Sequence, residues 1–474
     1  MLFRQIPDPK LAQYAYLVGC QRTGEALVID PERDVDRYVA VAAAEGLRIT
    51  AVTETHIHAD FLSGARELAE RTGAHLFLSD EGDEDWKYEW ARGLGSKVTL
   101  LHHGDSFFVG KIELKALHTP GHTPEHVSFL VIDHGSGMEE PMGIASGDFV
   151  FVGDLGRPDL LESAAGVKGA MEPSAERLYE SVQSFLELPD FLQVWPAHGA
   201  GSACGKALGA VPMSTVGYEK RANTAIDAAR RGAADFVRMI LDGQPEPPLY
   251  FGRMKELNKV GVPPLPSLPE PRRLSAEELE RLSRRDGAVV LDTRLDRRAF
   301  MAGHLPGSIY APLNKSFPTI TGSYVLPEET IYLVVEESRV EEAVRDLVRI
   351  GLDKVAGFLP PADLEGLRGL DATRVLDFVA MEEALGQGGA RVLDVRRAAE
   401  FAAGQVPEAL NVAHTRLLER LEDLPRDREL LVHCASGARA ASAASLLERE
   451  GFRVSYVDGL FSSYDAGRAA AALA

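Results

Sequence analysis

Apolar and polar positions alternate in short blocks over roughly the first 250 residues, and the blocks are of two kinds. Short runs rich in valine, isoleucine and leucine are typical of buried strands, whereas apolar residues three or four apart are typical of helices that cover a sheet. We expect strands at 14–18, 26–29, 49–52, 112–117, 127–132 and 192–195. We expect helices at 34–44, 62–71 and 175–186. This alternation predicts a mixed α/β fold.

A proline-rich stretch and a repeat divide the rest of the chain. Residues 262–271 hold five prolines, which lack backbone donors and favour extended geometry, as in a linker. Beyond it, segments of similar sequence recur after about a hundred residues, which indicates duplicated units. The matching pairs are 288–294 with 390–396, 331–335 with 429–433, and 349–355 with 449–454 with one gap. We therefore predict an α/β domain at 1–255, a linker at 256–271, and two related α/β domains at 272–369 and 370–474.

Composition argues against a nucleic-acid-binding protein, a membrane protein and a disulfide-rich protein. Lysine and arginine total 51 against 71 aspartates and glutamates, and the net charge of −20 repels nucleic acids and anionic membranes. No stretch approaches the ~20 apolar residues of a membrane span, and no basic segment precedes an apolar run at the amino terminus. The three cysteines, Cys20, Cys204 and Cys434, are too few and too far apart for a disulfide framework. We expect a cytoplasmic protein whose cysteines are core residues or working thiols.

Side chains that bind metals occur in four separate turn sequences. An isolated His-x-His is more often a pair of core or surface histidines than a metal site. Here the turns together hold His56, His58 and Asp60, then His122, then Asp148, and then His198. Imidazole and carboxylate groups delivered from separate loops are how a protein encloses a transition metal, so the sequence predicts a metal site.

These turns, over about the first 255 residues, resemble the metallo-β-lactamase superfamily, and more narrowly its persulfide dioxygenases. The resemblance implies an αββα sandwich. Two-metal hydrolases of this superfamily carry His-x-His-x-Asp-His, and Phe61 stands here at the last position of that motif. A benzyl side chain has no lone pair for a second ion, so the pattern favours one metal.

Within the dioxygenase branch, the resemblance implies a mononuclear Fe(II) held by His56, His122 and Asp148, with zinc as the alternative in purified protein. Two histidines and one carboxylate leave adjacent positions for a persulfide sulfur and dioxygen. The resemblance then implies that the remaining ligand-type residues orient the ligands from behind and manage protons. These are His58, Asp60 and His198.

A second Gly-Asp dipeptide, ending at Asp154, competes with the one ending at Asp148. We prefer Asp148, because residues 156–159 resemble an element that follows the ligand in the dioxygenases. The segment 197–205 also resembles that branch and places Cys204 near the mouth of the site, although a buried structural cysteine is equally compatible. Arg157 and Tyr218 are candidates for contacts with the thiol that carries the persulfide.

Cys434 follows a buried-strand pattern and opens a short loop that ends at Arg439, before an alanine-rich helix. A cysteine at such a turn faces backbone N–H groups and the positive end of a helix, which stabilise the thiolate. An isolated buried cysteine is normally inert. The small residues between Cys434 and Arg439 let the backbone curl around an anion, so we expect a nucleophilic thiol.

The segment 372–465 resembles the rhodanese family, which matches both this loop and the Asp394-Val-Arg396 element. Residues 404–408 depart from the family pattern, which weakens the inference about substrate contacts. Tyrosine phosphatases have a similar loop, but with a longer spacing than the four residues found here, so phosphatase activity is a weaker alternative. In the preceding copy Glu336 stands where Cys434 stands, so no persulfide forms there. We interpret the domain 272–369 as structural.

Together these resemblances imply an enzyme of persulfide metabolism. We hypothesise that thiol persulfides and O2 give sulfite, and that Cys434 passes a sulfane sulfur to sulfite to give thiosulfate. One alternative is a zinc thioesterase of the glyoxalase II type with a sulfurtransferase domain. Another is a non-catalytic sulfur carrier or sensor with a structural metal. The resemblance also implies a homo-oligomer, and the sequence leaves the identity of the thiol carrier open.

Overall fold

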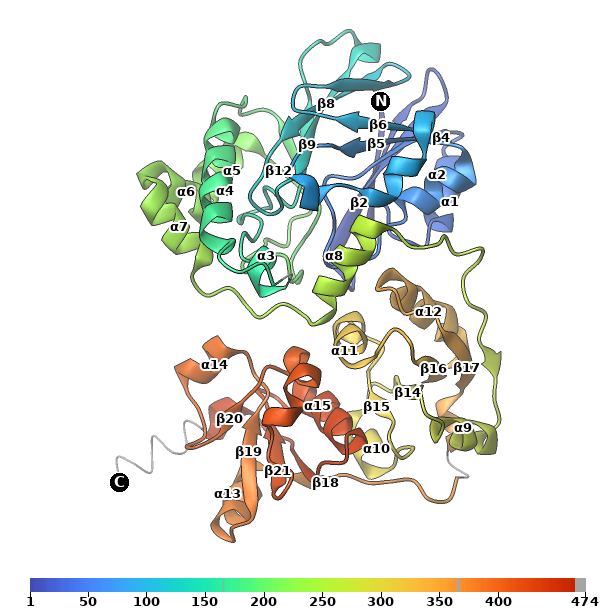
Figure 1. Cartoon of the computed structure of the whole chain (residues 1–474), viewed down its shortest axis with the longest axis vertical. Coiled ribbons are helices and arrows are strands. Elements are labelled where there is room, and N and C mark those ends of the chain that lie inside the picture. The colour runs from blue at the N-terminus through green and yellow to red at the C-terminus, as the bar shows by residue number, and fades with distance from the viewer. Residues whose placement is uncertain (165, 365–366, 465–474) are drawn as a thin grey trace. The chain divides into compact units, whose positions relative to one another are not determined.

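The computed structural model describes residues 1–164, 166–364 and 367–464 (Figure 1). The chain forms two compact units, which divide between Ser267 and Leu268 within the proline-rich stretch, with Val348–Gly351 counted with the first unit. Helix α8 (Tyr250–Val260) continues past residue 255, so residues 256–260, which we assigned to the linker, are helical. The last ten residues of the predicted domain 370–474 lie outside the described residues.

The first unit contains two six-stranded sheets. The first sheet has the order β1-β2-β3-β4-β5-β6, with bounds Leu2–Asp8, Gln13–Cys20, Glu25–Ile29, Arg48–Thr53, His75–Ser79 and Val98–Leu101. The second has the order β12-β11-β10-β9-β8-β7, with bounds, from β7 to β12, Ser106–Val109, Ile112–His118, Val127–Asp133, Gly143–Gly147, Gln193–Pro196 and Ser214–Thr215. Strands β3 to β6 pair in parallel, whereas β7 to β10 pair antiparallel.

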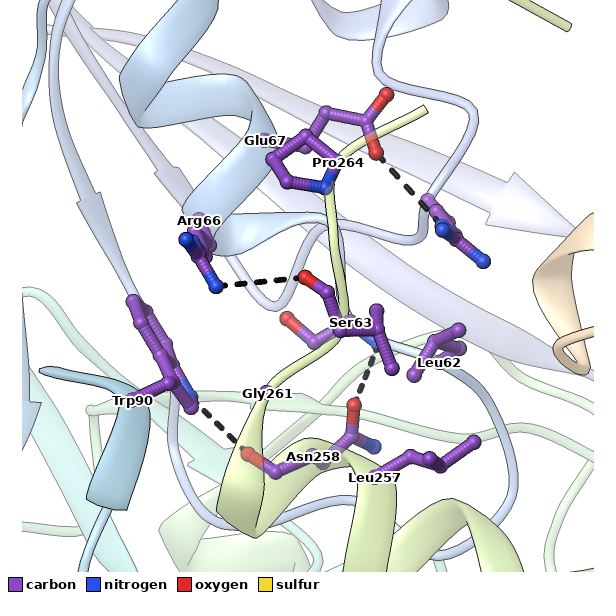
Figure 2. A pocket seen from close by; sticks show the side chains of 11 residues that line it. Leu62, Ser63, Arg66, Glu67, Trp90, Leu257, Asn258, Gly261 and Pro264 are labelled. Atoms are coloured by element: carbon purple, nitrogen blue, oxygen red, sulfur yellow. Dashed lines mark hydrogen bonds and ion pairs between the residues drawn. The ribbon is translucent and has the colours of Figure 1, made fainter. Parts of the chain in front are cut away.

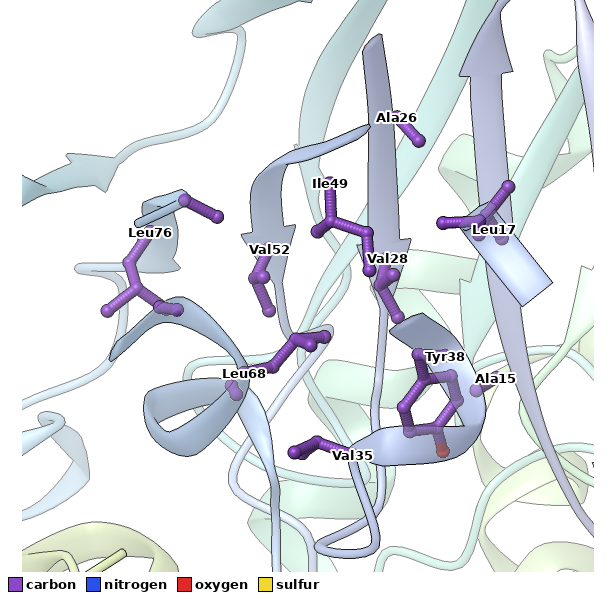
Figure 3. Packing of buried hydrophobic residues seen from close by; sticks show 14 of the residues in the cluster. Ala15, Leu17, Ala26, Val28, Val35, Tyr38, Ile49, Val52, Leu68 and Leu76 are labelled. Atoms are coloured by element: carbon purple, nitrogen blue, oxygen red, sulfur yellow. The ribbon is translucent and has the colours of Figure 1, made fainter. Parts of the chain in front are cut away.

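Helices cover the outer face of each sheet. The helices of the first unit are α1 (Asp36–Ala44), α2 (Ala65–Thr72), α3 (Leu160–Ser163), α4 (Met171–Leu186), α5 (Val216–Ala222), α6 (Thr224–Arg231), α7 (Ala233–Leu241) and α8. Figure 3 shows Tyr38 of α1 and Leu68 of α2 packed against Val28 and Val52 of the first sheet. A second apolar cluster lies between the sheets and a third joins the second sheet to α4, α6 and α7. Burial on both faces of both sheets gives the αββα sandwich.

The strands and helices expected in this unit are present, with ends shifted by a few residues. The helix expected from residue 62 begins at Ala65, because the Ser63 hydroxyl accepts a hydrogen bond from the Ala65 N–H and closes a turn before it. Strands β1, β7 and β10 were not predicted. β1 is interrupted by polar residues and a proline, β7 has four residues, and β10 carries glycine and serine, so no long apolar run marks any of them.

The second unit holds two parallel sheets of the same design. The first has the order β13-β17-β16-β14-β15, with bounds Arg272–Arg273, Val355–Leu359, Thr330–Val334, Ala288–Asp292 and Ile309–Tyr310. The second has the order β18-β22-β21-β19-β20, with bounds Arg374–Leu376, Val454–Val457, Glu429–His433, Ala390–Asp394 and Leu410–Asn411. The strand order is the same in both, so the sequence repeat is a repeat of structure.

The helices of the second unit follow the same plan. They are α9 (Ala276–Ser283), α10 (Arg297–Ala302), α11 (Phe317–Tyr324) and α12 (Val340–Arg349) in the first copy, and α13 (Phe378–Gly386), α14 (Ala398–Ala403) and α15 (Ala438–Arg449) in the second. In each copy an arginine two residues beyond an aspartate donates to that carboxylate and to the carbonyl of a glycine after the next helix. These are Arg294 with Asp292 and Gly303, and Arg396 with Asp394 and Gly404. Among the described helices of either unit, none is long and apolar enough to cross a membrane.

Candidate metal centre and thiol loop

The candidate metal centre lies where four strands of the sandwich end. His56 follows β4, His122 follows β8, Asp148 directly follows β10, and His198 follows β11. His56, His122 and Asp148 each offer one ligand atom, all within 4.8 Å of one another, and all three side chains are buried. The structure therefore brings the three predicted ligands together as a possible metal site.

Hydrogen bonds fix the direction of both imidazoles. The Nδ1 atom of His56 lies 2.9 Å from the Thr55 hydroxyl, and the Nδ1 atom of His122 lies 3.1 Å from the Arg157 carbonyl oxygen. The Nε2 atom of His122 faces a carboxylate oxygen of Asp148 at 3.4 Å. Each ring thus keeps its Nε2 atom for the centre of the cluster.

The donor set fits a cation. Asp148 is fully buried, and its two oxygens accept no hydrogen bond from the described residues, although the Cys204 thiol lies beside them. Burial raises the pKa of Asp148 to about 6, against the opposing effect of His198. Burial, together with neighbouring histidines, lowers the pKa of His56 and of His122 well below the usual range. Neutral imidazoles beside a buried carboxylate whose oxygens accept no hydrogen bond are the state that a metal ion requires of its ligands.

A layer of polar side chains behind this cluster was missed by sequence reasoning. Asp30 accepts hydrogen bonds from the Thr55 N–H at 2.7 Å and the Thr55 hydroxyl at 2.9 Å, and it lies 3.1 Å from the Nε2 atom of His58. Glu125 accepts from the Ile57 N–H at 2.7 Å, and His126 accepts from the Asp148 N–H at 3.0 Å. These bonds hold the backbone of the ligand turns.

His58 contacts this supporting layer through Asp30. Burial opposes its charged form, but the Asp30 carboxylate outweighs burial and raises the pKa of His58 to about 9. The aromatic ring of Phe61 lies against the His58 ring, with centroids 4.3 Å apart, and is completely buried. The position at which two-metal hydrolases carry a ligand is thus filled by hydrocarbon packed on an imidazole.

A second group of ligand-type atoms adjoins the first. Asp60, His198 and Cys204 offer atoms within 4.8 Å of one another, and all are buried. The Nε2 atom of His198 lies 3.3 Å from an Asp60 oxygen and 3.4 Å from an Asp148 oxygen. Burial raises the pKa of Cys204 well above the usual range, which keeps this thiol protonated. The Cys204 thiol therefore lies in the wall of the site.

The other residues singled out from the sequence lie in different surroundings. Asp154 accepts hydrogen bonds from the N–H groups of Leu155, Lys206 and Ala207, so its carboxylate is used in a loop. The guanidinium group of Arg157 is buried and donates to both oxygens of Asp159 and to two backbone carbonyls. Tyr218 lies on α5 with 59% of its surface exposed. A role for Arg157 or Tyr218 in binding the thiol carrier stays a prediction.

Helix α8 clamps the first ligand turn from outside. The side-chain amide of Asn258 donates to the carbonyl oxygens of His58 and Phe61, both at 2.8 Å, and its oxygen accepts from the Ser63 N–H at 2.8 Å. Figure 2 shows Asn258 beneath Ser63, with the Trp90 indole donating to the Asn258 carbonyl oxygen at 3.0 Å. This contact could not be predicted from the sequence, since Asn258 lies far along the chain from the turn that it holds.

The same helix places a lysine beside the metal cluster. Lys255 is buried, and its Nζ atom lies 4.2 Å from the centre of the Trp86 ring. Burial lowers the pKa of Lys255 to about 8, against the opposing effects of Glu125 and Cys204. Lys255 lines a cavity of about 560 Å³ together with Ile57, Trp86 and Lys259. Because Ile57 lies between His56 and His58, this cavity adjoins the ligand turn.

The thiol loop lies at the end of β21 in the second unit. Cys434 is buried at 1% exposure, and α15 begins at Ala438 after Gly437. Gly437 has a left-handed φ of +87°, and a Cβ atom there would lie 2.5 Å from the Tyr456 hydroxyl oxygen. Only glycine fits such a position, so the sharp turn that starts the helix is built into the loop.

Arg439 closes the loop. Its guanidinium group donates to both oxygens of Glu400 at 2.6 and 2.8 Å. These bonds raise the pKa of Arg439, and the neighbouring Cys434 sulfur adds to the shift. At the matching place in the first copy, Glu336 is exposed and precedes a short 3-10 turn, Glu337–Arg339. A thiol, a cationic residue and a helix start therefore coincide in the second copy, whereas the first copy lacks the thiol.

Comparison with known proteins gives a match for each unit. A family model described as the metallo-β-lactamase superfamily matches residues 8–198, and a model described as a rhodanese-like domain matches residues 379–466. The mitochondrial persulfide dioxygenase ETHE1 of Bos taurus is 30% identical over 203 residues, which cover 42% of this chain and 68% of that protein.

Two further similarities bear on the choice between activities. A hydroxyacylglutathione hydrolase of a Polaromonas strain is 32% identical over 190 residues, which cover 39% of this chain and 61% of that protein. A solved structure of a metallo-β-lactamase from Staphylococcus aureus is 41% identical, with a TM-score of 0.67, and the alignment covers 76% of this chain and 99% of that one. The similar proteins thus include both a persulfide dioxygenase and a hydroxyacylglutathione hydrolase.

Proposed function

The chain belongs to the metallo-β-lactamase superfamily and carries a rhodanese-like domain, and from this premise we propose that it oxidises thiol persulfides to sulfite and converts sulfite to thiosulfate. The metal we propose is a single Fe(II), held by His56, His122 and Asp148. The proposed substrates are a thiol persulfide, O2 and sulfite. The first reaction is RSSH + O2 + H2O → RSH + SO3²⁻ + 2 H⁺.

One observation carries the first half of the proposal. Two neutral imidazoles and a buried carboxylate without hydrogen-bond partners meet at the ends of strands, and Phe61 occupies the place of a further ligand. When bound, Fe(II) offers adjacent positions for a persulfide sulfur and dioxygen. His58, Asp60 and His198 support the ligands from behind, and the protonated Cys204 thiol presents a neutral wall.

The cavity that Lys255 lines supports the proposal that the thiol carrying the persulfide is negatively charged. A buried ammonium group over the Trp86 ring offers a positive charge close to the ligand turn. Small thiols with carboxylate or phosphate groups carry the matching negative charge. We infer that Lys255 binds such a group and thereby directs the terminal sulfur toward the metal.

The second half of the proposal uses Cys434. Its thiolate attacks the terminal sulfur of a persulfide RSSH, the S–S bond of that persulfide breaks, and RSH leaves, which gives Cys434–S–S⁻. The sulfur lone pair of sulfite then attacks the terminal sulfur and forms the new S–S bond of thiosulfate. The Cys434–S bond breaks and its electron pair returns to the Cys434 sulfur. Arg439 supplies a positive charge beside these anions.

The test is an oxygen electrode with the full chain, reloaded with iron under nitrogen. We expect oxygen consumption that depends on the added glutathione persulfide or coenzyme A persulfide, with one sulfite or thiosulfate formed for each O2. A thioester such as S-lactoylglutathione is the control substrate, since the hydrolase relative makes thioester hydrolysis the competing activity. Thioester cleavage by the zinc-loaded protein without persulfide-dependent oxygen uptake would establish the hydrolase instead. If the protein shows neither activity, the result would favour a sulfur carrier.

We expect the substitution Lys255→Met to raise KM for an anionic persulfide about tenfold while kcat changes little, because one charge–charge contact made in both ground and transition states is lost. Oxygen uptake at varied persulfide concentration gives both constants. Lys115→Met is the matched control, since Lys115 is exposed on β8 and its loss changes the net charge equally. Equal effects of the two substitutions would mean that Lys255 acts only through overall charge.

A further inference from the structure

A buried arginine joins three carboxylates of the first unit. Arg349 belongs to the segment Val348–Gly351, which is part of that unit. Its guanidinium group donates to both oxygens of Asp34, at 3.0 and 2.6 Å, and to an Asp8 oxygen at 2.6 Å. A Glu32 oxygen lies 3.4 Å from the same group. All three carboxylate side chains are buried, so a positive charge among them offsets the cost of placing them together away from water.

The turn between β1 and β2 connects Asp8 to one of the histidines of the metal centre. The second oxygen of Asp8 accepts from the N–H groups of Lys10 and Leu11, at 2.7 and 3.1 Å. Ala12, at the end of this turn, has a left-handed φ of +52°, which is strained for a residue with a Cβ atom. Its carbonyl oxygen lies 3.2 Å from the Nδ1 atom of His198. The carboxylate of Asp8 thus holds the turn that orients His198.

The loop after β3 contains both Glu32 and Asp34 and supports the first ligand turn. Asp30 begins this loop, also with a left-handed φ of +52°, and its carboxylate faces the Nε2 atom of His58 at 3.1 Å. A Cβ atom at Gly64 would lie 2.2 Å from the Glu32 carbonyl oxygen, so the loop lies directly against the residues that follow the ligand turn. A displacement of Glu32 or Asp34 would therefore be transmitted to the ligand turn.

The backbone of the same arginine holds a third segment. The Leu62 N–H donates to the Arg349 carbonyl oxygen at 2.6 Å. Leu62 directly follows Phe61, whose ring lies against the His58 ring at the end of the first ligand turn. One residue thus contacts the turn after β1, the loop after β3 and the ligand turn after β4, and each of these three segments carries or orients a side chain of the metal centre.

We propose that Arg349 is a positioning residue of the metal centre: its side chain and its carbonyl group together hold the three segments that orient the ligands. The inference rests on the metal centre of the proposed function, whatever substrate that centre oxidises. Without the guanidinium group the three buried carboxylates repel one another, and the segments are no longer held in one arrangement. Loss of groups that orient ligands from behind typically lowers metal affinity about 10- to 100-fold.

Cobalt binding tests this in the full chain, because the ligand-field absorption of Co(II) reports the geometry of its ligands and needs no persulfide. Metal-free protein is titrated with Co(II) under nitrogen, in competition with a chelating dye, at a temperature at which circular dichroism shows each variant to be folded. We expect Arg349→Met to weaken Co(II) binding about tenfold and to change the intensities of the absorption bands. Arg349→Lys keeps the charge but not the fork that binds both oxygens of Asp34, so it should weaken binding less.

Arg294→Met is the matched control, since Arg294 makes the same bidentate contact with Asp292 in the second unit. It should lower the melting temperature without altering the cobalt spectrum. Wild-type affinity and spectrum in folded Arg349→Met would overturn the inference, as would wild-type binding by Arg349→Lys if the methionine variant does not fold. If the wild type binds cobalt but oxidises no persulfide, the proposed activity fails while the titration still decides the role of Arg349.

Discussion

Replacing Cys434 with serine is expected to leave persulfide-dependent oxygen consumption at the wild-type rate and to reduce thiosulfate formation to background. A serine hydroxyl is not ionised at neutral pH and forms no persulfide, so the sulfane sulfur has no carrier. Sulfite should then accumulate in the amount in which the wild type forms thiosulfate. Both anions are measured by ion chromatography or as bimane derivatives after a fixed uptake of oxygen.

Cys20→Ser is the matched control for this prediction. Cys20 is buried on β2, and its sulfur accepts a hydrogen bond from the Lys111 N–H, which an oxygen can also accept. That variant should form thiosulfate like the wild type. If Cys434→Ser still forms thiosulfate at the wild-type rate, another group transfers the sulfur. If its oxygen consumption falls in parallel, the two reactions are not separate steps.

Asp148→Asn is expected to remove bound metal and to lower the rate of persulfide oxidation by about a thousandfold, because a metal ion contributes several kcal/mol to such a reaction. The amide keeps the shape of the side chain but loses the charge that balances the cation. Its NH2 group also faces His122 or His198, where the carboxylate oxygens lie now. Elemental analysis after anaerobic purification reports the metal, and the oxygen electrode reports the rate.

Asp154→Asn is the control, since Asp154 ends the competing Gly-Asp dipeptide. One oxygen of Asp154 accepts from the N–H groups of Lys206 and Ala207, and an amide oxygen can replace it. This variant should keep its metal and most of its activity, with at most a lower melting temperature. Retained metal in Asp148→Asn together with loss of metal in Asp154→Asn would reverse the assignment of the two aspartates.

Most of the predicted parts of the site follow an apolar run, and Asp148 is the exception, because β10 before it carries glycine and serine. The run before His56 marks β4, and the run before Cys434 marks β21, so the end of each strand and the side chains just beyond it are visible in the sequence. The repeat after residue 272 predicted two related α/β domains because the strands themselves recur. In both cases the prediction depends on the order of apolar and polar residues within a short segment, which a single sequence shows directly.

The residues that were missed act across the fold. Asn258 and Lys255 reach the ligand turn from a helix about 200 positions later, and nothing in the apolar pattern of α8 distinguishes them. Asp30 lies beyond β3 without any motif. His126 was the exception, because it lies four residues after His122 and a further imidazole near a ligand is a signal.

The hydrogen bonds at the Nδ1 atoms of His56, His122 and His198 have a consequence for the choice of ion. Since the Nδ1 atom of each ring already has a partner, the Nε2 atom is left for a ligand role and the rings need not turn to meet an ion. A cage of this kind does not reject zinc, manganese or cobalt by a misfit, because two imidazoles and a carboxylate suit all of them. Which divalent cation the newly folded chain acquires is then decided by the free concentrations of those cations in the cell, and growth conditions become a determinant of activity.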